Sequence, residues 1–253
     1  IHKEGKPPED CASYRPISLL GAEVKILAKV LSTRLNKVIT TIIHPDQSGF
    51  MPNRNTTLNL RRLHGVMTRA HLLGEDALLF SLDARKAFDM VEWNYLFAVL
   101  DRAGFGPGFV RWARLLYAEP LAQVAVNGGL SGTFALSRGT RQGCPPAVRP
   151  GLEPLAVWIR GDPLVRGIWW GDKWEDRISL YADDILLYVT DPYATLARLM
   201  HILSLFSSYS GYTINWEKSL IYPLCGAQPQ LPPGCDAQIV YTGFKYLGIF
   251  ITT

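Results

Sequence analysis

The sequence predicts an α+β fold, in which helices and short strands are mixed along the chain and the strands come as hairpins. Apolar residues recur at helical spacing in several long segments. Asn127-Gly128 separates two alternating runs, which is a strong hairpin signal. Hydrophobic residues make up 48% of the 253-residue chain, enough for a sizeable core. These observations favour an α+β fold over a doubly wound parallel sheet.

The N-terminal third predicts an extended segment followed by two helices. Residues 1–16 are polar and contain proline. Residues 24–42 and 58–73 both carry apolar residues at helical spacing. In the first of these helices, Lys25, Lys29, Arg34 and Lys37 occupy other positions, where they form either a solvated face or a phosphate-contacting surface. The sequence leaves both interpretations open.

The middle of the chain predicts a buried strand and two further helices. Residues 77–82 are a short apolar run, typical of a buried strand. Asp89 and Glu92 have the spacing of a capping box, which predicts a helix that ends near Gly104. A Gly-Pro-Gly sequence then interrupts the chain before another helix over residues 109–117.

The C-terminal third predicts a long helix, a loop and a strand pair. Asp191-Pro192 is a helix start, and Gly211 is a helix end. Residues 223–234 are rich in proline and glycine, as in a loop, and residues 241–251 predict a last pair of strands.

Composition narrows the class of protein. The net charge of +4 permits a nucleic-acid partner but does not require one. The four cysteines lie far apart and the five histidines lack metal-ligand spacing, so we expect a reducing compartment without a disulfide framework or a zinc site. Because no signal peptide or bilayer-length apolar run is present, we expect an intracellular protein, in the nucleus or the cytoplasm, with no membrane partner.

Two adjacent carboxylates, Asp183 and Asp184, interrupt the apolar run over residues 178–189. Burying two like charges side by side is unfavourable unless a positive charge lies against them. Adjacent residues on a straight strand point to opposite faces, so the two side chains converge only at a bend. The pattern predicts a hairpin with the acids at its tip, although aspartate is also common in turns that have no function.

A third carboxylate, Asp83, ends the expected strand over residues 77–82. Taken alone it is either a polar strand end or a helix cap. Three carboxylates at the ends of buried strands suit hard divalent cations, which prefer oxygen ligands. Two such ions can activate an attacking oxygen and stabilise a leaving oxygen in phosphoryl transfer. Asp83, Asp183 and Asp184 are therefore candidate metal ligands.

The order of seven sequence blocks resembles the reverse transcriptase domain of LINE-type (non-LTR) retrotransposons. The blocks span nearly the whole chain, and they are YRPIS (14–18), QSGFMPNR (47–54), SLDARKAFD (81–89), RGTRQGCP (138–145), YADD (181–184), GYTINWEKS (211–219) and YLGI (246–249). The resemblance implies an RNA-directed DNA polymerase with a right-hand fingers and palm architecture, an antiparallel palm sheet packed on helices, and little of the thumb.

The resemblance also implies a division of the chain. Residues 1–75 correspond to a fingers-like region, and residues 76–222 to the palm with interleaved fingers segments. Residues 223–253 correspond to a truncated palm–thumb junction with a primer-grip-like hairpin. Since the chain begins with Ile1 and stops near the last block, we expect it to be a piece of a longer protein.

The same resemblance implies the metal and the catalytic residues. Asp83, Asp183 and Asp184 would bind two Mg²⁺ ions. Lys218 matches the residue that donates a proton to the pyrophosphate leaving group. Taken without the family, Lys218 reads as an ordinary surface lysine.

Five further residues match nucleotide-binding positions, namely Phe88, Arg54, Arg15, Gln142 and Gly143. Phe88 would stack under the sugar and exclude a 2′-hydroxyl, although it is equally suited to a core position. Gln142 and Gly143 would lie along the nucleotide and template. Arg54 and Arg15 would hold the triphosphate, or are surface cations. The implied partners are an RNA template, a DNA primer and deoxynucleoside triphosphates.

The sequence departs from the family pattern directly after Cys144-Pro145. The family continues with an apolar helix, whereas this chain has Pro-Ala-Val-Arg-Pro-Gly over residues 146–151, as a pair of compensating frameshifts would produce. Proline costs about 3 kcal/mol and glycine about 1 kcal/mol inside a helix, so Pro150 and Gly151 are expected to disrupt it.

This departure leaves an alternative open: a decayed, catalytically inactive nucleic-acid-binding remnant. A metal-dependent phosphohydrolase using the same acids is less favoured, because no histidine lies near the three acidic positions to activate water.

Overall fold

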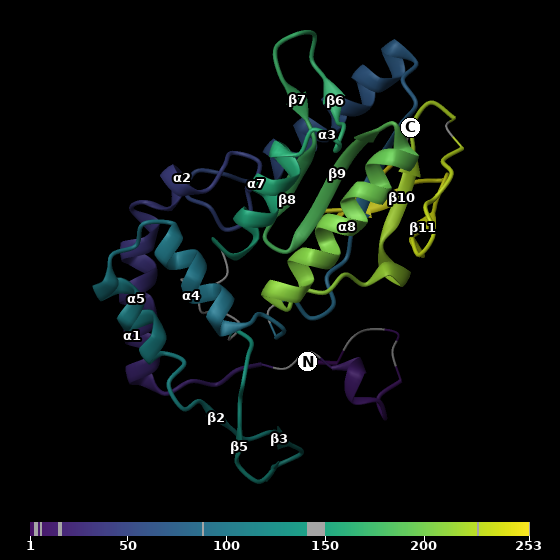
Figure 1. Ribbon diagram of the computed structural model, residues 1–253. Helices are drawn as coiled ribbons and strands as arrows, with labels where there is room; N and C mark the ends of the chain where they lie inside the picture. Colours follow the sequence, from purple (N-terminus) through teal and green to yellow (C-terminus); the bar gives the residue numbers. More distant parts are fainter. Residues whose placement is uncertain are drawn as a thin grey trace.

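The computed structural model describes residues 1–2, 5, 7–14, 17–87, 89–140, 150–226 and 228–252. Its centre is a five-stranded sheet with the strand order β11-β10-β1-β9-β8 (Figure 1). The strands are β1 (Ala77–Leu82), β8 (Ile178–Tyr181), β9 (Asp184–Thr190), β10 (Leu220–Pro223) and β11 (Gln238–Ile239). Neighbouring strands are antiparallel except for the β10–β11 pair, which is parallel. The predicted α+β class is confirmed.

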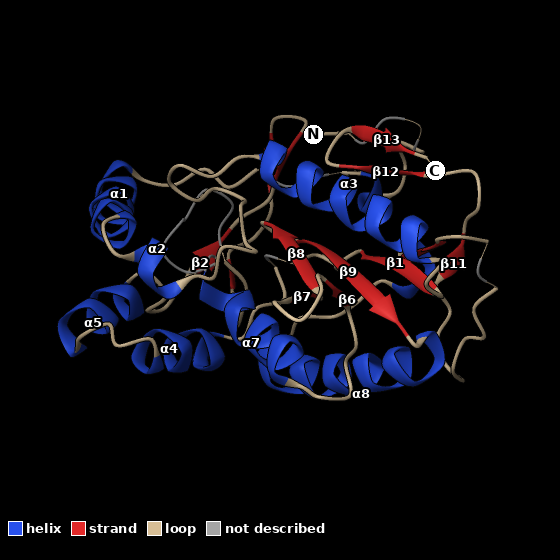
Figure 2. Cartoon of the chain, turned by 90° about the horizontal axis from the view of Figure 1, so that it is seen from above, coloured by secondary structure: helices blue, strands red, loops and turns tan. Residues whose placement is uncertain are grey.

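Helices cover both faces of the sheet. Figure 2 shows α3 (Thr56–Leu73) on one side of the strands, and α7 (Glu153–Gly161) and α8 (Pro192–Ser210) on the other. Because successive strand residues face opposite sides, Phe80 of β1 packs in the core with α7 and α8, whereas Leu79 packs in the core with α3. Burial of β1 on both faces explains why its sequence is continuously apolar.

A separate helical cluster lies beside the sheet (Figure 1). It contains α1 (Ala22–Asn36), α4 (Trp93–Arg102) and α5 (Pro107–Leu115), packed around Leu31, Leu96 and Leu100. The single helix predicted over residues 24–42 is wrong, because the chain forms α1 and then a short α2 (Ile39–Ile42). The helix is interrupted at Lys37 and Val38 and resumes as the single turn of α2.

The predicted capping box is also wrong. Glu92, not Asp89, is the N-cap of α4, and its side chain makes no capping hydrogen bond. The backbone N–H of Glu92 instead donates to the carbonyl of Ser210 at 2.9 Å, at the end of α8. A tertiary contact therefore sets the start of this helix.

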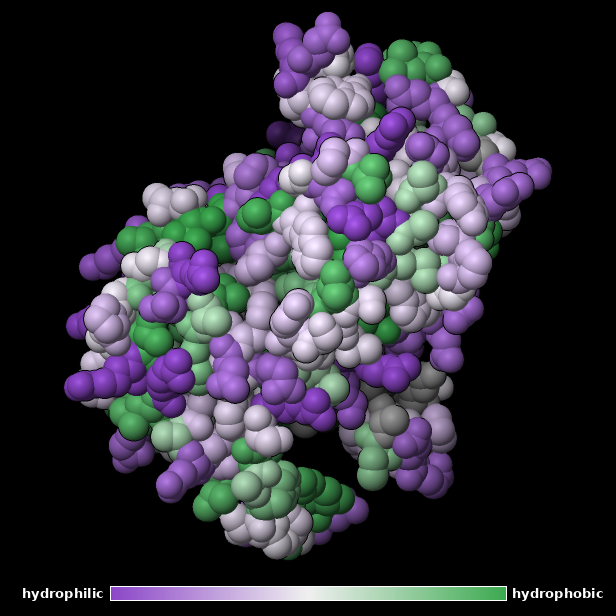
Figure 3. Space-filling view, viewed as in Figure 1, coloured by the Kyte–Doolittle hydropathy of each residue, from purple (hydrophilic) through white to green (hydrophobic). Residues whose placement is uncertain are grey.

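The Asn127-Gly128 hairpin is confirmed. Both residues have positive φ, 49° and 80°, as a two-residue type I′ turn requires. The surrounding strands form a projecting arm that carries exposed apolar side chains, seen as a green lobe in Figure 3. The arm contains β2 (Leu121–Ala122), β3 (Ala125–Val126), β4 (Gly129–Leu130) and β5 (Phe134–Ala135).

Two further strand pairs and three 3₁₀ turns complete the described chain. They are β6 (Ile168–Trp169) with β7 (Glu175–Asp176), β12 (Phe244–Tyr246) with β13 (Ile249–Ile251), and η1 (Cys11–Ser13), η2 (Pro150–Leu152) and η3 (Trp216–Lys218). The β12–β13 pair matches the strand pair predicted at the C-terminal end. Of the helices in the described ranges, none combines the length and the apolarity needed to cross a membrane.

The structure changes the interpretation of the prolines after residue 145. Residues 146–149 lie outside the described ranges. Pro150 and Gly151 are not in a helix interior, because they form η2 and α7 begins afterwards at Glu153. Proline before a helix removes no helical hydrogen bond, so the predicted helix-interior penalty at these two residues does not apply.

Candidate active site

The acidic pair lies at a tight turn between two sheet strands. Tyr181 pairs with Asp184 as the last pair of the β8–β9 ladder, so Ala182 and Asp183 alone form the turn. Ala182 has φ 57°, in the left-handed region that residues with a side chain seldom adopt. The predicted hairpin tip is confirmed, with Asp184 as the first residue of β9.

Asp83 joins this pair through the sheet register. In the β1–β9 ladder Leu82 pairs with Ile185, so Asp83 and Asp184 are the next residues to lie opposite each other. Asp83 directly follows β1, at the same end of the sheet as the β8–β9 turn. The structure therefore brings the three predicted carboxylates to one end of two adjacent strands.

The three carboxylates carry negative charge that no ion pair within the described residues balances. Burial raises the pKa of Asp184 to about 6, and the charges of Asp183 and Asp83 add to this effect. Burial and the charge of Asp83 also raise the pKa of Asp183. Within the described ranges, no lysine or arginine forms an ion pair with any of the three. Such a site favours a bound cation.

The carboxylates are neighbours but not a ready-made ligand set. Across the described part of the chain, no three acid, histidine or cysteine side chains are grouped closely enough to hold a metal ion as they stand. The donor chemistry nevertheless fits Mg²⁺, because carboxylate oxygens are the ligands that hard divalent cations prefer.

Lys218 lies in η3, on a segment that follows the backbone of Asp83. The Asn215 N–H donates to the Asp83 carbonyl at 2.8 Å, and the Asp83 N–H donates to Ser219 Oγ at 3.1 Å. The side chain of Lys218 is exposed. The structure thus brings the Lys218 turn next to Asp83 and leaves the ammonium group in solvent.

Tyr212 is a buried site residue that the sequence interpretation missed. Its hydroxyl donates to the Asp183 carbonyl at 3.3 Å, and the side chain is 4% exposed. Burial raises its pKa, and the charges of Asp183, Asp184 and Asp83 raise it further. Tyr212 belongs to the same block as Lys218, but a tyrosine after a helix-ending glycine reads only as a core aromatic.

Arg54 makes contacts that differ from its predicted role. Its guanidinium donates to the carbonyls of His44 at 2.6 Å, Gln47 at 2.7 Å and Ile43 at 3.0 Å. These bonds hold the loop that precedes α3. Triphosphate binding by Arg54 stays a prediction.

The remaining predicted nucleotide contacts lie outside the described residues, so their roles also stay predictions. They are Arg15, Phe88, Gln142 and Gly143.

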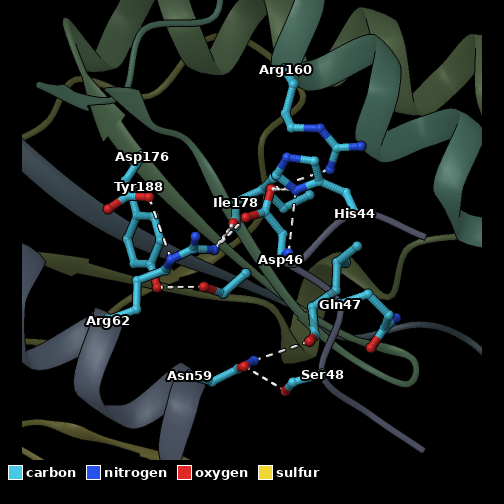
Figure 4. Close-up of polar contacts among 12 residues, drawn as sticks. His44, Asp46, Gln47, Ser48, Asn59, Arg62, Arg160, Asp176, Ile178 and Tyr188 are labelled. Atoms are coloured by element: carbon cyan, nitrogen blue, oxygen red, sulfur yellow. Dashed lines mark hydrogen bonds and ion pairs between the residues drawn. The ribbon is translucent and has the colours of Figure 1, made fainter. Parts of the chain in front are cut away.

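A charged cluster next to this loop was not predicted either (Figure 4). Asp46 is 5% exposed and forms ion pairs with Arg62 and with Arg160 at 3.2 Å, and its Oδ2 lies 2.9 Å from His44 Nδ1. Arg62 also contacts Asp176 at 3.4 Å. The cluster joins the loop to α3, α7 and β7. The spacing of these residues in the sequence does not predict the cluster, because its members come from distant segments of the chain.

Comparison with known proteins agrees with these observations. A family model described as reverse transcriptase (RNA-dependent DNA polymerase) matches residues 1–251. The chain is 32% identical over 253 residues to the transposon TX1 uncharacterized 149 kDa protein of Xenopus laevis, with 95% of this chain and 19% of the relative covered.

Two Drosophila melanogaster relatives cover the chain to a similar extent. The Pol polyprotein of the type-2 retrotransposable element R2DM is 28% identical over 98% of this chain and 24% of its own length. The RNA-directed DNA polymerase from mobile element jockey is 27% identical over 98% of this chain and 28% of its own length. The chain thus spans between 19% and 28% of these three relatives.

Solved telomerase structures share the fold. Telomerase from Candida albicans in complex with a TWJ fragment of telomeric RNA matches with a TM-score of 0.60 and 11% identity, over 91% of this chain and 37% of that one. Apo telomerase from Candida tropicalis matches with a TM-score of 0.62 and 11% identity, over 90% of this chain and 39% of that one. At this identity the similarity concerns the fold.

Proposed function

Because the chain belongs to the reverse transcriptase (RNA-dependent DNA polymerase) family, we propose that it catalyses RNA-directed DNA synthesis as part of a non-LTR retrotransposon protein. The observation that carries the proposal is the position of Asp83 opposite Asp184, next to the Asp183 turn. In this proposal residues 1–75 form a fingers-like region, residues 76–222 form the palm with interleaved fingers segments, and residues 223–253 form a truncated palm–thumb junction with a primer-grip-like hairpin.

Asp83, Asp183 and Asp184 would hold two Mg²⁺ ions, which when bound activate the primer 3′-hydroxyl and stabilise the leaving oxygen. Burial and the charges of the neighbouring carboxylates raise the pKa of both Asp183 and Asp184, so a bound cation would stabilise their ionised forms, which supports this assignment. Lys218 would give a proton to the departing pyrophosphate, a task that suits an exposed ammonium group on a turn beside Asp83.

The other predicted residues would select and orient the substrates. Phe88 would exclude a 2′-hydroxyl, Gln142 and Gly143 would lie along the nucleotide and template, and Arg15 and Arg54 would bind the triphosphate. The substrates are an RNA template, a DNA primer and deoxynucleoside triphosphates. The Arg54 guanidinium already donates three hydrogen bonds to loop carbonyls. Triphosphate binding by Arg54 would therefore use its remaining N–H donors.

Primer extension on an RNA template tests the proposal. The chain is joined to the downstream segment of the jockey polymerase, because it spans only 28% of that relative. We expect Mg²⁺-dependent extension from the natural sequence and none from Asp183→Asn. Extension that persists in Asp183→Asn would contradict the assignment of the metal ligands.

A second candidate function is a nucleic-acid-binding remnant without catalysis. It is favoured by the sequence of residues 146–151, which departs from the apolar segment that the family pattern implies there. A repaired variant, in which an apolar family-like segment replaces residues 146–152, separates the two candidates. Extension by the repaired variant alone identifies a silenced copy, and extension by both identifies an active enzyme. If neither extends the primer, the polymerase proposal for this chain is wrong.

A further inference from the structure

The turn that carries Asp183 is held by the side-chain amide of Gln47. Gln47 Oε1 accepts a hydrogen bond from the Ala182 N–H at 2.9 Å, and Gln47 Nε2 donates to the Ala182 carbonyl at 3.1 Å. One side chain thus satisfies both backbone groups of Ala182. Gln47 is 4% exposed, so these bonds are shielded from water.

The backbone of the Gln47 loop also packs directly on the turn. Gln47 Oε1 accepts a second hydrogen bond from the Gly49 N–H at 2.8 Å. A Cβ atom on Gly49 would lie 2.0 Å from the Ala182 nitrogen and 2.7 Å from the Tyr181 carbonyl carbon. The two backbones are therefore in van der Waals contact, and only glycine permits this approach.

The loop is itself fixed to the sheet. The Ser48 N–H donates to the Leu180 carbonyl at 2.9 Å, and the Leu180 N–H donates to the Asp46 carbonyl at 2.9 Å. Gln47 and Leu180 form a parallel bridge, so the loop runs beside β8 as an additional edge segment. The hydrogen bond from Arg54 to the Gln47 carbonyl also holds the loop. The ion pairs of Asp46 with Arg62 and Arg160 add to this (Figure 4).

A second contact restrains the turn from within the core. The Tyr212 hydroxyl donates to the Asp183 carbonyl at 3.3 Å. Its ring packs against Phe206 of α8, with ring centroids 5.9 Å apart, which fixes its direction. Gln47 therefore restrains the first residue of the turn, and Tyr212 restrains the second.

These contacts maintain a strained backbone conformation at Ala182. Residues with a Cβ pay of order 1 kcal/mol or more for a left-handed φ, and they keep it only where the surroundings enforce it. Ala182 at φ 57° has such surroundings. Relaxation of the Ala182 backbone would change the direction of the chain at the adjacent Asp183 and so move its carboxylate, because the two residues form one tight turn.

We propose that Gln47 and Tyr212 are positioning residues that hold the Asp183 carboxylate in place for metal binding, each acting through the backbone of the Ala182–Asp183 turn. The inference rests on the proposed function, in which Asp183 is a metal ligand. Groups that orient a ligand from outside the coordination shell affect metal affinity by about 10- to 100-fold, and we expect effects of this kind here.

Binding of Mn²⁺ to the chain, followed by electron paramagnetic resonance of the free ion, tests the proposal without an activity assay. Gln47→Met removes the amide while keeping a similar volume, and Ser48→Ala is the matched control. Ser48 is the next residue in the same buried loop, and its Oγ donates to Asn59 Oδ1 of α3 and not to the turn. Asp183→Asn is the blank.

We expect Gln47→Met to weaken Mn²⁺ binding about 10-fold or more, and Ser48→Ala to stay within about twofold of the unchanged chain. Tyr212→Phe keeps the ring and should weaken binding to a smaller extent, so it decides the question if Gln47→Met does not fold. Urea unfolding of each variant separates a loss of affinity from a loss of folded protein.

The outcomes distinguish the inference from the proposed function. Unchanged Mn²⁺ affinity in both Gln47→Met and Tyr212→Phe overturns the positioning role and leaves the polymerase proposal standing. If the unchanged chain shows no Mn²⁺ binding that depends on Asp183, the metal assignment is wrong and the positioning role is wrong with it.

Discussion

Asp83 lies opposite Asp184 at the end of the β1–β9 ladder, as the next position after the paired Leu82 and Ile185. Opposite positions on antiparallel strands hold their Cβ atoms about 4.5–5.5 Å apart, and like charges placed there are destabilising. Asp183, on the adjoining turn, adds a third negative charge. Repulsion among the three carboxylates therefore destabilises the metal-free protein, and the same negative charge attracts cations.

Replacement of Asp184 by asparagine should therefore stabilise the metal-free protein. Its ionised form is disfavoured in the folded state, where the pKa is raised to about 6. In EDTA at pH 8 we expect Asp184→Asn to raise the free energy of unfolding by about 1 kcal/mol. Solvent screening of this exposed residue keeps the gain below that of full burial. Urea titration measures the change, and Asp172→Asn on an exposed turn is the control.

The same carboxylate predicts a pH dependence. Between its ordinary pKa of 3.8 and the folded value of about 6, Asp184 binds more protons in the folded than in the unfolded state. Its contribution to stability therefore falls as the pH rises through this window and is constant above it. Urea unfolding in EDTA from pH 4 to pH 8 should show a drop that is smaller in Asp184→Asn. Equal pH profiles would contradict the raised pKa.

Gly49→Ala should separate the loop from the Asp183 turn. Its Cβ would lie 2.0 Å from the Ala182 nitrogen, so the backbone has to move, and we expect a loss of about 1–3 kcal/mol of stability. Gly161→Ala, at the end of α7 with nothing within 4 Å of its Cβ, is the matched control and should lose none. Chemical unfolding of the two variants provides the comparison, and equal stability would argue against the tight contact.

Lys218→Ala should impair chemistry without affecting the fold. Because the side chain is exposed, we expect unfolding and Mn²⁺ binding to stay as in the unchanged chain. Loss of a general acid lowers rates by about 100-fold or more, which single-turnover primer extension would show as a slower chemical step. Lys37→Ala, another exposed lysine, is the control. A rate within a few fold of normal would rule out the proton-donor role.

Arg62→Met should destabilise the whole protein. Arg62 pairs with Asp46 and Asp176, and both carboxylates are buried. Asp46 keeps its ion pair with Arg160, but Asp176 loses the ion pair with Arg62. Removing one partner of a buried ion pair costs about 3–5 kcal/mol when the remaining charge is left without compensation. The adjacent, exposed Arg61 offers a matched control, and Arg61→Met should change stability by about 0.5 kcal/mol or less. Thermal unfolding distinguishes the two, and equal melting temperatures would contradict the structural role of the cluster.

Features with a local cause could be predicted from the sequence alone. The apolar run of β1, the Asn127-Gly128 turn, and the long helix between Asp191 and Gly211 all follow from periodicity and turn residues. The ordered sequence blocks identified the family, and acids at strand ends identified Asp83 and its partners as candidate site residues. Sequence patterns gave the wrong result where a tertiary contact determines the structure. The start of α4 is an example, because the backbone N–H of Glu92 donates to the Ser210 carbonyl at the end of α8.

The sequence by itself therefore determined the family, the fold class and the candidate carboxylates, because short-range patterns and block order encode them. Only the tertiary structure decided that Asp83 faces Asp184, that Arg54 bonds to loop carbonyls, and that Gln47 and Tyr212 hold the Asp183 turn. Gln47 and Ala182 are separated by 135 positions in the chain. Such a contact depends on the register and packing of the sheet, which the spacing of residues in the sequence does not specify.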